Sequence, residues 1–170
     1  MSQQQSQQKD TASIEERAKR ANVRDDQSDP TRPIRLIVAG SRDADQYGEF
    51  RTKLCSFLDY IGWERTEIVC GRSARGVDDM CYHFIRWDVQ HPHVIFEADW
   101  DQFDKKAGPY RNEAMAIYAS RAPEQGELFV LWDGSSRGTR SMINLARRYH
   151  LDSKVHIIEP WAREHFYRVY

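Results

Sequence analysis

The chain has 170 residues, a formal net charge of −1 and three cysteines. This length supports one domain with a buried core. The balanced charge gives no electrostatic reason to expect nucleic acid or a membrane surface as a partner, and no apolar run approaches the roughly 20 residues of a membrane-spanning helix. Cysteines that are odd in number and lack paired spacing favour free thiols in a reducing cytoplasm over disulfides or a metal site.

Both ends of the chain differ in composition from its body. Residues 1–32 are polar and rich in glutamine, and prolines punctuate the end of this segment, so the pattern predicts a flexible tail. The folded domain is expected over residues 33–160. Residues 161–170 are rich in aromatic side chains, and they are expected to be either a docked segment or an interface.

Short apolar runs alternate with helical periodicity along the body of the chain. The predicted strands span residues 34–39, 67–70, 93–96, 128–132 and 155–158, with amphipathic helices between them. This alternation predicts an α/β fold: a single doubly wound, mainly parallel sheet of about five strands flanked by helices, which is Rossmann-like. With the strand order 3-2-1-4-5, the winding reverses between the first and fourth predicted strands.

Loops rich in glycine, serine and arginine follow three of these strands. They are Gly40-Ser41-Arg42, residues 71–76 (GRSARG) and residues 133–139 (DGSSRGT). The carboxyl ends of parallel strands meet at one edge of a sheet, so we expect the loops to converge there. Free amides at a helix start, hydroxyls and guanidinium groups together suit phosphate. Capping and solvated charge would explain any one loop, but the repeated pattern favours a phosphate-bearing ligand.

Other chemistries fit the sequence less well. Neither GxGxxG nor a P-loop pattern occurs, so no NAD, Mg-ATP or other cofactor is expected. The acidic loop at Asp99, Asp101 and Asp104 lacks a calcium-loop glycine, and the histidines lack zinc spacing, so no metal is expected. Trp100 would stack on a base or pack as a lid. Asp78 would accept a ribose hydroxyl, act as a base or complement the helix dipole.

Four motifs appear in a fixed order: GSRD, GRSARGVDD, ADWDQFDKKAGPYRNEAM and DGSSRGTRSM. In this order they resemble the YspA/YpsA-related branch of the SLOG superfamily, Rossmann-like domains related to the Lonely guy enzymes. The resemblance spans about residues 34–158. It implies a nucleotide or nucleotide-derived ligand and a homo-oligomer. Some members of the superfamily cleave the N-glycosidic bond of nucleoside monophosphates, and others act as nucleotide-signal sensors.

The resemblance transfers unevenly to individual residues. Arg111-Asn112 takes the place of an Arg-Lys pair in the Lonely guy enzymes, and Gly138-Thr139 matches their glycine-threonine pair. Their glutamate falls on Met142, and a thioether serves neither as an acid nor as a base. Arg111 and a substitute acid, Asp78, are therefore the expected catalytic residues if the chain is an enzyme.

The sequence thus predicts a binder of a nucleotide or nucleotide-derived signal. The alternatives are a nucleotide N-glycosidase or phosphoribohydrolase, and a protein-interaction module with a vestigial pocket. The expected ligand-binding residues are Gly40, Ser41, Arg42, Gly71, Arg72, Gly76, Asp78, Trp100, Arg111, Asn112, Gly134, Ser135, Ser136, Gly138 and Thr139.

Overall fold

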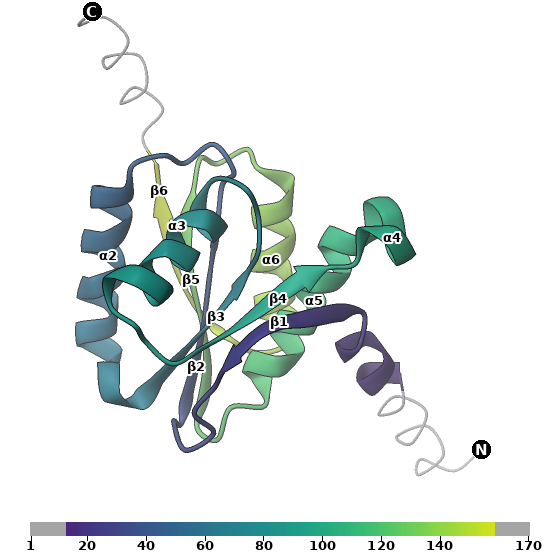
Figure 1. Ribbon diagram of the computed structural model, residues 1–170, viewed down its shortest axis with the longest axis horizontal. Coiled ribbons are helices and arrows are strands. Elements are labelled where there is room, and N and C mark those ends of the chain that lie inside the picture. The colour runs from purple at the N-terminus through teal and green to yellow at the C-terminus, as the bar shows by residue number, and fades with distance from the viewer. Residues whose placement is uncertain (1–12, 159–170) are drawn as a thin grey trace, which may run out of the picture.

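The computed structural model describes residues 13–158, which form one sheet with helices on both faces (Figure 1). The sheet has the strand order β1-β4-β3-β2-β5-β6. Its strands are β1 (Ala21–Gln27), β2 (Ile34–Gly40), β3 (Thr66–Gly71), β4 (His93–Ala98), β5 (Gln125–Trp132) and β6 (Asp152–Ile157). β2 to β6 run parallel, and β1 pairs antiparallel with β4. The Rossmann-like α/β fold is therefore as predicted, and its parallel strands have the order that was assumed for locating the reversal.

The helices pack in two layers. They are α2 (Tyr47–Ile61), α3 (Val77–His83), α4 (Trp100–Phe103), α5 (Ala107–Ser120) and α6 (Arg137–Arg148), with short helical turns η1 (Trp63–Arg65), η2 (Phe84–Asp88) and η3 (Asp104–Lys106). α2 and α3 share one core cluster with the sheet, and α5 and α6 share the other. The central strands are buried on both faces, and this is why they read as continuous apolar runs. None of the helices within residues 13–158 combines the length and apolar character needed to cross a membrane.

Strand β1 corrects the prediction of a flexible tail, because residues 21–27 of that segment belong to the sheet. Its sequence, ANVRDDQ, is almost entirely polar, so no apolar pattern marks it. The strand is held by its ladder to β4 and by ion pairs at its exposed edge, Arg24 to Glu97 at 2.6 Å and Arg86 to Asp25 at 2.8 Å. Residues 1–12 and the aromatic segment 161–170 lie outside the described part of the chain.

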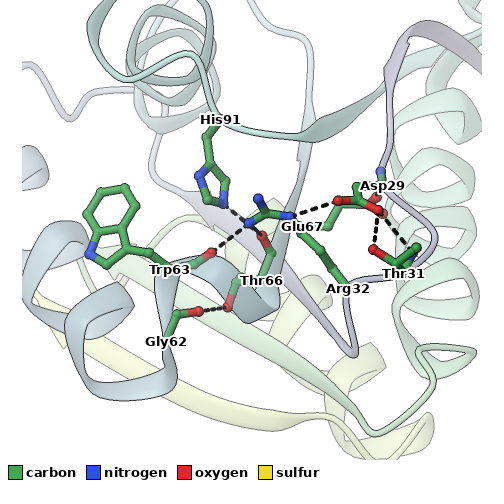
Figure 2. Close-up of polar contacts among 8 residues, drawn as sticks. All are labelled: Asp29, Thr31, Arg32, Gly62, Trp63, Thr66, Glu67 and His91. Atoms are coloured by element: carbon green, nitrogen blue, oxygen red, sulfur yellow. Dashed lines mark hydrogen bonds and ion pairs between the residues drawn. The ribbon is translucent and has the colours of Figure 1, made fainter.

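A polar network fixes the link between β1 and β2 at the amino ends of the strands (Figure 2). The Asp29 amide donates to the buried carboxylate of Glu67 at 2.8 Å. The guanidinium of Arg32 donates to the carbonyls of Trp63 and Thr66 at 2.6 and 2.9 Å. These bonds set where β2 begins, at the end of the parallel strands opposite the predicted ligand site.

Candidate functional site

The winding of the sheet reverses between β2 and β5. β2 pairs with β3 on one side and with β5 on the other, so the loops that follow these strands meet at one point. The Ser41 amide donates to the Leu131 carbonyl at 3.0 Å, and the Val77 amide donates to the Ser41 carbonyl at 3.2 Å. A Cβ at Gly76 would collide with the backbone of Arg42. The loops that were predicted to converge therefore contact one another directly.

A cleft of about 440 Å³ opens at this junction, bounded by the loops and by α4, α5 and α6. The expected ligand-binding residues that line it are Gly40, Arg42, Asp78, Trp100, Arg111, Asn112, Ser136, Gly138 and Thr139. Lining residues absent from the prediction include Lys105, Gly108, Pro109, Met115 and Ser141. The glycine-proline start of α5 was the available sequence signal for this wall, because such a pair marks a helix start near the sheet edge.

The remaining expected residues support the cleft from outside its lining. They are Ser41, Gly71, Arg72, Gly76, Gly134 and Ser135. Ser41 is fully buried, and its hydroxyl accepts a hydrogen bond from the Asp133 amide at 3.0 Å. Gly71 leaves space for Arg111, because a Cβ there would lie 2.5 Å from the Arg111 Nη1. Arg72 turns away to pair with Asp79 at 3.0 Å.

The loop before α6 satisfies part of its own hydrogen bonding. The Asp133 carboxylate accepts from the amides of Ser135 and Ser136 at 2.9 and 2.8 Å, so neither amide is free for a ligand. Burial alone would raise the pKa of Asp133, but these amides and the Ser41 hydroxyl stabilise the anion and leave that pKa below its usual value. Asp133 thus shapes the loop, a role that its sequence position did not reveal.

The amides of the first turn of α6 are different. Ser136 is the N-cap residue and its side chain makes no capping bond. Within residues 13–158, the amides of Arg137, Gly138 and Thr139 have no hydrogen-bond partner, and these residues line the cleft. The first turn of this helix contains no acidic residue and instead carries Arg137 and Arg140. Cations are unfavourable at that end, so an anion bound there would stabilise the helix.

The lining of the cleft is strongly cationic. It contains five cations, Arg42, Arg75, Lys105, Arg111 and Arg137, and one carboxylate, Asp78. Among the described residues, no carboxylate lies within ion-pair distance of Arg42, Lys105 or Arg137. Arg75 is exposed and reaches Asp43 at 3.6 Å. Three cations without an ion-pair partner in the described part of the chain therefore line the same cleft as the amides at the start of α6.

Arg111 and Asp78 form a largely buried ion pair in the wall of the cleft. Their atoms Nη1 and Oδ2 lie 3.1 Å apart, and both side chains are nearly buried. Arg111 also donates to the Arg72 carbonyl and to the Asn112 side chain. It is therefore held in place rather than left free as a cation. Met142, at the position where the resemblance places a glutamate, is buried and lines the same cleft.

Trp100 forms the rim. Its side chain is 52 % exposed at the start of α4, where the Asp99 carboxylate caps the Gln102 amide at 3.0 Å. A Cβ at Gly108 would lie 3.5 Å from the indole, so the ring lies beside the α5 backbone. An exposed indole at the rim of a cleft suits contact with a planar, aromatic group.

Comparison of the chain with protein-family models, with curated proteins and with solved structures finds no match. The functional argument therefore depends on the residues of the cleft.

Proposed function

We propose that this chain binds a nucleotide or nucleotide-derived signal in the cleft, with a phosphate group at the start of α6. The observation that carries this proposal is one concave site that contains three amides and three cations without a partner among residues 13–158. Helix-start amides and positive charge gathered in one concave site favour binding of an anion there. The resemblance to nucleotide-binding SLOG domains supports the same class of ligand, and the free thiols favour a location in the cytoplasm.

The cleft suggests an orientation for such a ligand. The phosphate would lie against the amides of Gly138 and Thr139, with Arg42 and Arg137 as charge partners. The Asp78 carboxylate is positioned to accept a sugar hydroxyl, and Trp100 is positioned to contact the base. A volume of about 440 Å³ lies within the roughly 300–1,000 Å³ range of small-molecule sites.

Hydrolysis of the N-glycosidic bond is the second candidate. It is favoured by the Arg111–Asp78 pair, the only acid and its partner in the lining. That carboxylate already accepts a charged hydrogen bond, and Met142 supplies no second acid. Binding without turnover is therefore the better-supported function. Release of free base from a nucleoside monophosphate, lost in Arg111→Ala, would instead establish the enzyme.

Calorimetry with a panel of mono-, di- and cyclic nucleotides tests the proposal. We expect at least one to bind, and Arg137→Gln to weaken that binding at least tenfold because it removes an unpaired cation at the phosphate position. Arg147→Gln is the matched control, an exposed arginine at the other end of the same helix. Failure of every nucleotide to bind, or equal losses in both variants, would contradict the proposal and favour a vestigial pocket on an interaction module.

A further inference from the structure

The two edges of the sheet are built differently. β1 carries a register shift between Val23 and Asp25, and its edge bears several charges. Bulges and charges are features by which proteins prevent a sheet edge from pairing with another chain. β6 pairs with β5 in unbroken register, without a bulge or a proline. β6 thus lacks the bulge, although it carries the exposed charges of Asp152 and Lys154.

Some exposed apolar side chains lie on and near β6, among polar and charged ones. Of the exposed large hydrophobic side chains among the described residues, Val155 and Ile157 lie on β6 itself. Tyr60, which is 85 % exposed, lies across a groove of about 1030 Å³ between α2 and β6, which we call the β6 groove. Three of the six exposed large hydrophobic side chains among the described residues thus lie on or near β6, with Val155 and Ile157 on one face of the sheet and Tyr60 on the other.

The outer edge of β6 also presents free backbone groups. The Ile158 amide donates to the Trp132 carbonyl at 2.7 Å, so residue 158 faces β5. Because backbone groups alternate in direction along a strand, those of Ser153 and Val155 face outward. No other described strand pairs with β6 on that side.

An acidic pair beside the β6 groove lacks a cation. Glu127 is only 8 % exposed, yet within residues 13–158 it has no hydrogen bond or ion pair with another side chain. Burial, and then the neighbouring Asp152, raise the pKa of Glu127 to about 7. The two acids are register partners on β5 and β6. The nearby cations Lys53 and Arg65 pair elsewhere, with Glu49 and Glu124.

We propose that β6 pairs antiparallel with β6 of a second copy of this chain, with Ser153 on the two-fold axis. In this register Asp152 lies directly opposite Lys154 of the second copy, and the reciprocal pair forms at the same time. A shift by one residue about the axis places Lys154 opposite its own copy, which is unfavourable. Charge complementarity therefore favours this register over the neighbouring one.

The pairing would satisfy each of the open features at once. Outward amides and carbonyls of Ser153 would bond to their counterparts, and Val155 would be covered at the new strand boundary. Asp152 and Lys154 become a close, non-hydrogen-bonded pair, the type in which side chains approach most closely. The lysine of the second copy would bring positive charge to the side of the sheet on which Glu127 lacks a partner. This interface lies on the sheet edge and does not require a ligand in the cleft.

Sedimentation analysis of the full chain over a range of concentrations tests the interface. We expect a reversible dimer, and we expect Asp152→Lys and Lys154→Asp each to weaken it at least tenfold because each places like charges opposite one another. The double variant D152K/K154D should recover the dimer. An equimolar mixture of the two single variants should associate as well, since every facing pair is then of unlike charge.

The controls separate this interface from other contacts. Asp101→Lys reverses an exposed charge on α4, away from β6, and should leave association unchanged. Amide exchange at Ser153 and Val155 should slow as the protein concentration rises. A chain that stays monomeric at every concentration would overturn the proposal, with protected β6 amides then indicating that the chain itself covers the edge. A dimer indifferent to both charge reversals would overturn it too.

Discussion

Single glycines decide how closely the strand-end loops approach one another. A Cβ at Gly40 would strike the Leu131 carbonyl and the side chain of Val77, both fixed in the core. Gly40→Ala should therefore lower the free energy of unfolding by about 1–3 kcal/mol, measured by chemical denaturation. Gly48→Ala is the control, since a Cβ there meets nothing within 4 Å in α2, and alanine should stabilise the helix by about 0.5–1 kcal/mol. Equal effects at the two positions would contradict this account of the junction.

Glu127 makes stability depend on pH in an unusual direction. Its pKa is raised by burial to about 7, from 4.5 for an ordinary glutamate. The folded state thus holds a proton that the unfolded chain releases, so stability falls as pH rises from about 4.5 through 7. Glu127→Gln should be more stable than the wild type at pH 8, by on the order of 1 kcal/mol, and equal to it at pH 4.

Thermal unfolding at concentrations where the chain is monomeric would measure this difference between Glu127→Gln and the wild type. Glu64→Gln, which replaces an exposed glutamate in η1, serves as the control and should show no such crossover. A constant difference across pH for the Glu127 variant would show that the carboxyl group titrates normally.

At the scale of elements, the polar network at the start of β2 contributes measurably to the free energy of unfolding. Arg32 satisfies the carbonyls of Trp63 and Thr66. Arg32→Met should cost about 2–3 kcal/mol of unfolding free energy, because charged hydrogen bonds are lost and partly buried carbonyls lose a donor. Arg65→Met removes only an exposed ion pair with Glu124 and should cost less than about 1 kcal/mol. Denaturant titration of both variants compares them, and similar losses would show that the network is peripheral.

The elements also show what sequence patterns can predict. Five parallel strands were predicted, because the central strands are buried on both faces and form apolar runs, and glycine loops mark the ends of three strands. Their order was assumed rather than derived from the sequence. β1 was missed, because polar residues 21–27 acquire their strand conformation from β4, a partner distant in the sequence. Local periodicity contains no information on that pairing.

For the predicted ligand residues too, the sequence indicated their place in the fold but not their side-chain contacts. The sequence placed many of them near one edge of the sheet, and several now line one cleft. Their pairing was not predictable: Arg111 with Asp78, Arg72 with Asp79, and the loop amides with Asp133 all depend on side-chain distances that the fold creates. Lys105 was also missed, since a lysine in a polar loop has no signature of its own.

For the molecule as a whole, the unpaired cations of the cleft should couple ligand binding to stability. An anion that binds the folded chain alone stabilises it by mass action. Inorganic pyrophosphate should therefore raise the melting temperature more than sodium chloride of equal ionic strength. The difference should vanish in Arg137→Gln and persist in Arg147→Gln, as followed by calorimetric scanning. Identical responses to the two salts would contradict specific anion binding.

The interlocked loops around Ser41 have a consequence for how this protein can diverge. Backbone hydrogen bonds join the ends of β2 and β5 and the start of α3. At positions 40 and 76 these segments lie so close together that only glycine fits. An insertion in any one loop would displace the other two, so the base of the cleft tolerates little change in loop length. New ligand preferences would have to arise by exchanging single side chains or by rebuilding the short α4 segment, the one wall whose helix has no fully buried residue.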